Sequence, residues 1–105
     1  MLKLVYYVPE SHLERTKAAI FAAGAGGIGN YSQCAWQVKG QGQFQANDGA
    51  NPFLGQIGQL ECVDEWRVET IVPEQSAQAV HRALMQSHPY EEPAFEFYQL
   101  VDVFA

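Results

Sequence analysis

The amino-acid sequence predicts an α+β fold with the element order β-α-β-β-α-β. Two observations lead to this prediction. Four segments alternate their side chains with the period of two that strands show, and two segments place apolar residues at helical spacing directly after a Pro-Glu pair. Because 105 residues are too few for two independent hydrophobic cores, we expect residues 1–105 to form a single domain.

The first half of the chain predicts a strand, a helix and a second strand. Residues 2–8 alternate aromatic and β-branched residues and are apolar on nearly both faces, which is typical of a strand. Pro9 and Glu10 favour a first helical turn, and Gly24 is predicted to end that helix. Residues 33–39 alternate again and are predicted to form the second strand.

The second half predicts a long loop, a strand, a helix and a last strand. The polar segment 40–58 holds Asp-Gly and Asn-Pro turn signals and is predicted to be a loop. Residues 59–72 alternate as a third strand. A second helix opens at Pro73 and must stop at His88, because the following proline disfavours helical backbone there. Residues 94–103 are aromatic-rich and are predicted to form the fourth strand.

This order is that of the ferredoxin-like fold, a four-stranded antiparallel sheet with both helices on one face. Two helices can cover only one face of such a sheet. The first strand nevertheless carries Val5 and Tyr7 on its second side, and residues 94–104 are rich in aromatic side chains. An uncovered apolar face is typical of an interface, so we expect a homo-oligomer, either a trimer or a dimer.

Charge and composition exclude several classes of protein. The sequence holds six Lys and Arg against twelve Asp and Glu, a formal net charge of -6, which disfavours nucleic acid and anionic membranes as partners. It has no apolar run near the roughly 20 residues of a membrane span, and its first residues lack the features of a signal peptide. We therefore expect a cytoplasmic protein in which Cys34 and Cys62 are reduced, buried thiols.

The segment Gly24 to Gly29 matches the G-x-G-x-x-G pattern of dinucleotide-binding sites. That chemistry requires the glycines to follow a strand and to open a helix, whose N-terminus then faces the pyrophosphate. Here the glycines close a helix and lead into a strand. We interpret them as a helix-capping turn and expect no nucleotide to bind there.

The densest polar cluster is His88-Pro89-Tyr90-Glu91-Glu92-Pro93. Imidazole and carboxylate groups are ligands for zinc and other divalent cations, so His88, Glu91 and Glu92 are candidate metal ligands. The same groups are a possible acid-base set. The competing interpretation is structural, because a histidine at a helix C-terminus is stabilised there and can bond one of the last carbonyls.

Several segments and single residues form a pattern that spans nearly the whole chain. They are segments 24–26, 28–32, 40–44, 49–52 and 88–93 with Cys34, Gly55, Glu61, Glu65 and Arg67. Together they resemble the YqfO-type domain, over about residues 2–102. In bacterial dinuclear-metal-centre proteins of the YqfO/YbgI class, that domain is inserted between the two halves of a metal-binding core. The resemblance implies a fold similar to CutA and PII proteins, which assemble into trimers; CutA proteins carry a similar His-Pro-Tyr-Glu turn, and some are linked to divalent-cation tolerance.

The resemblance implies a standalone YqfO-type domain without the enzyme's metal centre. The two-metal centre of the longer proteins uses several histidines and acidic residues of the flanking halves, and three histidines are too few to rebuild it. We expect a non-enzymatic, oligomeric binding or regulatory module with no catalytic residues. A small ligand or a protein partner would bind where segment 40–58 meets the 88–93 turn at a cleft between subunits, on Phe44, Tyr90 and Glu91.

One alternative stays open at this point. The chain could be a divalent-metal-binding protein or a metal-assisted enzyme that uses His88 with Glu91 or Glu92. A neighbouring subunit would then complete the ligand set, because three ligands from one short turn are geometrically awkward. In that case a divalent metal ion is the cofactor.

Overall fold

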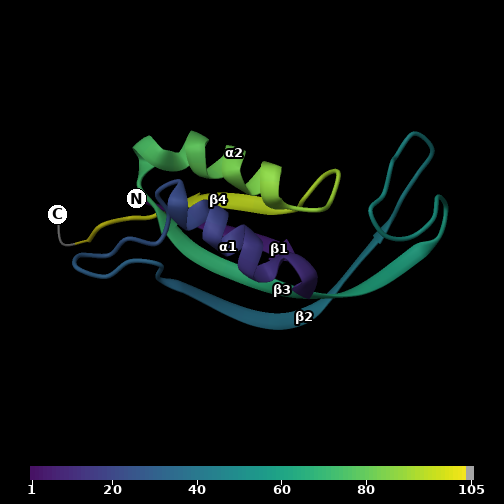
Figure 1. The fold of residues 1–105 in the computed structure, drawn as a ribbon, viewed down its shortest axis with the longest axis horizontal. Coiled ribbons are helices and arrows are strands. Elements are labelled where there is room, and N and C mark those ends of the chain that lie inside the picture. The colour runs from purple at the N-terminus through teal and green to yellow at the C-terminus, as the bar shows by residue number, and fades with distance from the viewer. Residues whose placement is uncertain (104–105) are drawn as a thin grey trace.

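Four strands and two helices follow one another in the predicted order within residues 1–103, which are the residues that the computed structural model describes (Figure 1). Each helix is preceded by one 3-10 turn, at Glu10–His12 and at Glu74–Ser76. The α-helices are α1 (Leu13–Ala22) and α2 (Ala77–Ser87). The strands are β1 (Leu2–Val8), β2 (Ala35–Gln45), β3 (Leu60–Val72) and β4 (Phe95–Gln99).

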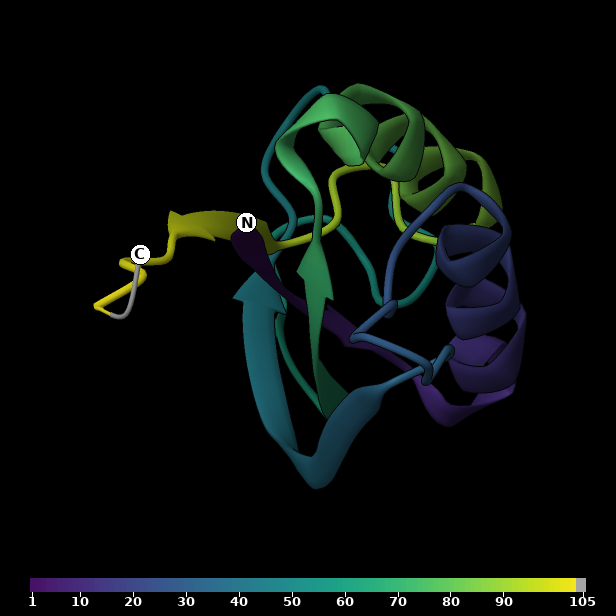
Figure 2. The same cartoon turned by 90° about the vertical axis from the view of Figure 1, so that its left-hand side faces the viewer.

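The four strands form one antiparallel sheet in the order β2-β3-β1-β4. Figure 2 shows both helices on the same side of this sheet, where they contact each other. The predicted ferredoxin-like fold is thereby confirmed. Among residues 1–103, neither helix has the length and hydropathy that a membrane-spanning segment needs.

The hydrophobic core lies between β1, β3 and the two helices. Alternate residues of β1 face the helices and are fully buried, as the period of two predicts. Each buried aliphatic side chain of this kind contributes about 1.5–3 kcal/mol through its removal from water. The fully buried aliphatic residues of this core are Leu4, Val8, Ile20, Val68, Val72, Val80 and Leu84.

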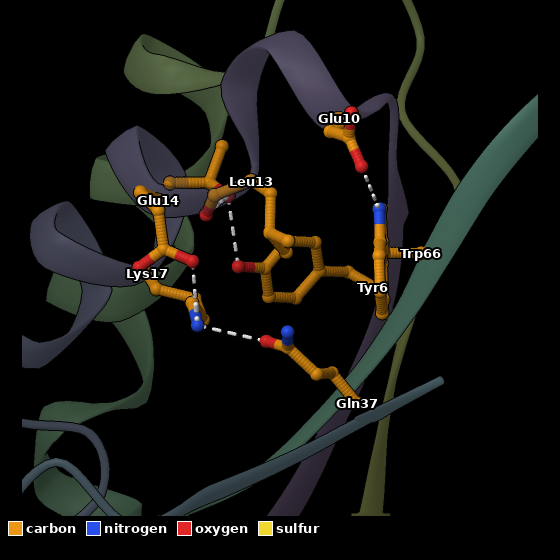
Figure 3. A network of polar contacts seen from close by, with 8 residues as sticks. Tyr6, Glu10, Leu13, Glu14, Lys17, Gln37 and Trp66 are labelled. Carbon is orange, nitrogen blue, oxygen red and sulfur yellow. Dashed lines mark hydrogen bonds and ion pairs between the residues drawn. The ribbon is translucent and has the colours of Figure 1, made fainter. Parts of the chain in front are cut away.

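Polar contacts also fasten α1 to the sheet (Figure 3). The Tyr6 hydroxyl lies 2.9 Å from the Thr16 hydroxyl, which donates to the Leu13 carbonyl at 3.0 Å. Burial raises the pKa of Tyr6 to about 12, so this phenol stays neutral and donates to Thr16. At the other side of the helix, Lys17 Nζ donates to Gln37 Oε1 of β2 at 2.7 Å. These bonds fix the helix relative to both a central and an edge strand.

Both helices end where the sequence predicts. At the end of α1, the Ala25 N–H donates to the Ile20 carbonyl and the Gly24 N–H to the Phe21 carbonyl, at 3.0 and 3.1 Å. This is a Schellman cap, and Gly24 supplies the positive φ of 120° that it requires. The glycine-rich segment therefore follows a helix. At the end of α2, His88 is already extended, with φ -83° and ψ 139°.

The predicted loop over residues 40–58 is wrong in its first part. Residues 40–45 belong to β2 and pair with residues 60–65 of β3, which leaves a loop over 46–59. Since β1 pairs only with residues 66–72 of β3, the paired segments 40–45 and 60–65 extend beyond the sheet (Figure 1). We call them the β2–β3 arm. Apart from Phe44, residues 40–45 are glycine and glutamine, so they show no apolar alternation and gave no strand signal.

The fourth strand is shorter than the predicted 94–103. It ends at Gln99, although the Leu100 N–H still donates to the Met1 carbonyl at 3.2 Å. Val101 and Val103 are 83% and 76% exposed, so their apolar character reflects no buried strand face. Phe104, which the oligomer prediction included, lies outside the described residues.

The face of the sheet away from the helices, which we call the open face, is mixed rather than uniformly apolar. Trp36, Val38 and Tyr98 are 59%, 43% and 51% exposed on it, next to charged residues of β3 and β4. Phe95 and Phe97 were expected to contribute to this face, but both pack against the core on the helix side. The open face is thus less aromatic than the sequence predicts.

The two cysteines lie far apart along the β2–β3 ribbon. Cys34 precedes β2 at the helix-covered end and is half-buried, whereas Cys62 lies in the arm and is exposed. The prediction of two buried thiols is therefore wrong for Cys62. Cys62 is exposed because the arm extends beyond the part of the sheet that the helices cover.

Candidate functional site

A hollow of about 680 Å³ lies where the arm, the 46–59 loop and the 88–93 turn meet. Its volume is that of a typical small-molecule site. The loop is closed at its base, because the Gly58 N–H donates to the Ala46 carbonyl at 2.7 Å. It is joined to the turn where the Asn51 N–H donates to Glu91 Oε1 at 2.9 Å. Three segments distant in sequence therefore form one site.

The hollow contains all three residues predicted to bind a ligand, Phe44, Tyr90 and Glu91. The ring of Tyr90 lies 6.3 Å from the ring of Phe44 and 6.3 Å from that of Phe53. The three rings are tilted by 47–51° and form an aromatic wall. Phe53 was missed by sequence reasoning, although an aromatic residue directly after Asn-Pro in a polar segment was a usable signal.

His88 holds the 88–93 turn against β1. Its side chain is only 7% exposed. Its Nδ1 accepts the Tyr90 N–H at 3.1 Å, so Nε2 carries the proton and donates to the Tyr7 carbonyl at 2.7 Å. Burial lowers the pKa of His88, and the nearby charge of His12 acts in the same direction. The imidazole is therefore neutral and bonds a strand carbonyl, not a last helix carbonyl as the sequence suggested.

The structure does not bring the candidate metal ligands His88, Glu91 and Glu92 together. Both ring nitrogens of His88 are occupied by backbone hydrogen bonds, and Glu91 accepts the Asn51 N–H. Across residues 1–103, no three His, Cys, Asp or Glu side chains are grouped closely enough to hold a metal ion. The donor set of this turn does not fit a metal within one chain.

Tyr90 and Glu65 form the polar part of the hollow. The Tyr90 hydroxyl is buried beside the Glu65 carboxylate, although no hydrogen bond of ordinary length joins them within the described residues. Burial and the neighbouring Glu65 carboxylate raise the pKa of Tyr90, so the phenol keeps its proton. Gly42 makes room for Glu65, because a Cβ at that position would occupy the space of the carboxylate. Glu65 was not among the predicted site residues, since its strand position gave no hint that it faces the turn.

Tyr7 connects the hollow with the open face of the sheet. It lines the hollow, and its hydroxyl accepts a hydrogen bond from Arg67 at 3.3 Å. The Arg67 guanidinium also lies 5.9 Å from the centre of the Tyr7 ring and 3.5 Å from the Glu69 carboxylate. Arg67 is thus engaged on the open face and does not line the hollow.

No family model matches the chain. It is 52% identical over 99 residues to the protein named GTP cyclohydrolase 1 type 2 homolog from Mycobacterium leprae (strain TN), covering 94% of this chain and 26% of that protein. It is 49% identical over 96 residues to the protein of the same name from Bacillus subtilis (strain 168), covering 91% and 26%. The chain thus spans about a quarter of the length of these curated relatives.

Solved structures show two resemblances, one to a NIF3-related protein and one to CutA proteins. A Bacillus cereus protein related to NIF3 aligns with a TM-score of 0.83 and 42% identity, covering 96% of this chain and 26% of that one. CutA1 from Pyrococcus horikoshii aligns with a TM-score of 0.71 and 15% identity, covering 98% and 86%. The PII-like protein CutA from Nostoc sp. PCC 7120 aligns with a TM-score of 0.68 and 16% identity, covering 95% and 81%. The chain therefore resembles a segment of NIF3-related proteins and has a CutA-like, PII-like fold.

Proposed function

We propose that this chain is a non-enzymatic binding module that takes up a small ligand in the hollow between the 46–59 loop and the 88–93 turn. The observation that carries this proposal is a ligand-sized hollow with a wall of three aromatic rings, built by three segments distant in sequence. Small-molecule sites are typically concave and mostly apolar with a few polar groups, which Tyr90 and Glu65 supply here. His88, the histidine beside the hollow, is committed to the backbone and is not free to act as a base.

The module corresponds to a YqfO-type domain, with residues 1–105 acting as one unit. The activity to which the relatives' name refers is not part of this proposal, because the match covers about a quarter of their length. The two free thiols, Cys34 and Cys62, support a reducing compartment, the cytoplasm.

We further propose that the module self-associates, as a trimer or a dimer, through the open face and the β2–β3 arm. Trp36 and Val38 of the edge strand are exposed, as is Tyr98 of the opposite edge. An isolated two-stranded ribbon is at best marginally stable in water, so the arm gains support if a second copy covers it. The exposed apolar residues of the open face favour an interface there.

Sedimentation equilibrium at micromolar concentration tests the self-association. We expect a mass that is a multiple of 11.7 kDa for the wild-type chain. Trp36→Glu should shift the mass toward one chain, whereas Met85→Glu, which changes an exposed apolar residue of α2, should leave it unchanged. A wild-type species of 11.7 kDa alone would contradict this part of the proposal.

Ligand-observed NMR with a library of neutral, cationic and anionic fragments tests the binding function. We expect some fragments to bind and to shift the amide resonances of Phe44, Phe53 and Tyr90 in the labelled protein. Phe44→Ala should weaken these fragments, and Met85→Glu should not. The proposal is wrong if no fragment of any charge perturbs the hollow.

A further inference from the structure

We propose that the ligand of this hollow is a small organic cation, an amine or quaternary ammonium compound. The inference rests on the proposed binding function and names the chemical class of its ligand. It is carried by three features of the hollow: the charge of its lining, the arrangement of its aromatic rings, and the polar pair formed by Tyr90 and Glu65.

The charge of the lining is entirely negative. Residues from three parts of the chain contribute carboxylates, and the described residues of the lining include neither lysine nor arginine. A concave site lined by one sign of charge concentrates ligands of the opposite sign. The four acidic residues of the lining are Asp48, Glu65, Glu91 and Glu92.

The aromatic rings provide a surface that suits a cation. The rings of Phe44 and Phe53 each have their centroid 6.3 Å from that of Tyr90, and all three line the hollow. The His88 ring packs against Tyr90 at 4.9 Å, so the two phenylalanine rings complete the aromatic surface offered to a ligand. An ammonium group over the face of an aromatic ring is stabilised by about 0.5–2 kcal/mol, more where water is excluded.

The polar pair of Tyr90 and Glu65 distinguishes a cation from a neutral apolar ligand. Glu65 reaches the hollow from β3 across Gly42, and the buried Tyr90 hydroxyl lies beside its carboxylate. The ammonium group of an amine can donate N–H bonds to that carboxylate, and a quaternary ammonium group, which has no N–H, can lie against the same charge. Either ligand compensates the charge of Glu65, whereas an anion would be repelled.

Two matched pairs of probes test the sign of the ligand charge. Choline is compared with its uncharged isostere 3,3-dimethylbutan-1-ol, and butylammonium with butan-1-ol, each titrated into labelled wild-type protein and followed by amide chemical shifts. Butyrate serves as the anionic probe. We expect at least one ammonium probe to saturate shifts at Phe44 and Tyr90, with an affinity at least about tenfold above that of its uncharged isostere, the ratio expected from about 1.4 kcal/mol of charge recognition.

A matched pair of variants locates the source of that preference. Glu65→Gln removes one carboxylate from the hollow and should reduce the preference several-fold. Glu96→Gln makes the same change of charge at an exposed position of β4 and should leave the preference intact. An equal loss in both variants would assign the effect to overall charge and overturn the proposed site.

The remaining outcomes separate this inference from the binding function on which it rests. If an uncharged isostere or butyrate binds as tightly as the ammonium probes, the hollow binds ligands but the cation proposal is wrong. If neither ammonium probe gives saturable shifts at tens of millimolar, the cation proposal is likewise wrong, and the fragment library then decides whether the binding function survives.

Discussion

Replacing His88 by alanine should destabilise the protein by far more than the loss of an average surface side chain. The ring is 7% exposed and joins β1 to the 88–93 turn through two backbone hydrogen bonds. Its removal leaves the Tyr7 carbonyl and the Tyr90 N–H without these partners. A buried group left unpaired costs about 1–3 kcal/mol. Because the Tyr7 carbonyl and the Tyr90 N–H are only partly buried, we expect the free energy of unfolding to fall by about 2–3 kcal/mol for the two together.

Thermal unfolding followed by far-UV circular dichroism at pH 7.5 measures this loss. For a domain of this size, the expected decrease of Tm is roughly 10–20 °C. The variants must be compared at one protein concentration, because self-association makes Tm concentration-dependent. His12→Ala is the matched control, since within residues 1–103 its ring hydrogen-bonds the exposed Ser11 side chain and contacts the Phe53 ring at 5.9 Å but bonds no backbone group, so a change within about 1 kcal/mol is expected. Equal Tm values for wild type and His88→Ala would refute the bridging role.

The same residue predicts the direction of a pH effect. Burial holds the pKa of His88 in the folded protein below its ordinary value of 6.5, so folding favours the neutral ring. The resulting stability is fully present above the unfolded-state pKa and is lost as pH falls through the folded-state value. Wild type should therefore lose stability below about pH 6.5 more steeply than His88→Ala. Parallel pH profiles for the two proteins would contradict this assignment.

Four further predictions concern a buried hydrogen bond, a glycine of the arm, metal binding and nucleotide binding. Tyr6→Phe should reduce the free energy of unfolding by about 1 kcal/mol in denaturant titrations, because the bond to Thr16 is lost; an unchanged value would contradict that bond's contribution. Gly42→Ala should displace the Glu65 carboxylate and weaken ammonium binding in the NMR titration, with little change in Tm. Calorimetric titration with zinc and copper should give no stoichiometric site in wild type; tight binding that His88→Ala abolishes would instead establish the metal-binding alternative. Titration with ATP should leave the amide resonances of residues 24–29 unshifted, because those glycines lie at the C-terminal end of a helix.

The elements that bury one face were predictable from the sequence, and those that bury none were not. β1 shows its period of two because Leu4, Tyr6 and Val8 must face the helices. The ends of α1 and α2 follow from Gly24 and from the proline after His88, which act locally. The β2 half of the β2–β3 arm, residues 40–45, lacks both kinds of signal because it consists mostly of glutamine and glycine, whereas residues 60–65 of its β3 half alternate and lay within the predicted strand 59–72.

The site residues divide in the same way, into those that a sequence pattern identifies and those that depend on contacts between distant segments. Phe44, Tyr90 and Glu91 stand out because their segments resemble a known domain, and the structure places all three around the hollow. The bond between His88 and the Tyr7 carbonyl spans 81 positions of the chain, so no local pattern could identify that partner. Glu65 lay inside the predicted third strand, but it became a site residue only through the extension of β2 to Gln45, which the sequence left undetected.

The position of Tyr7 predicts that ligand binding in the hollow and self-association of the chain influence each other. Its ring borders the hollow, while its hydroxyl and ring face engage Arg67 on the surface proposed to receive a second copy. A ligand that moves Tyr7 changes the surroundings of the Arg67 guanidinium. A second copy of the chain that binds over Arg67 and immobilises it changes the hollow in turn. Thermodynamic reciprocity requires the two effects to be equal in size for each hollow. The dissociation constant of the assembly, measured with and without saturating ammonium probe, should then change by the square of the factor by which assembly changes probe affinity for a dimer with one hollow per subunit, and by its cube for a trimer. Tyr7→Phe, which keeps the ring and removes the bond to Arg67, should weaken that mutual dependence.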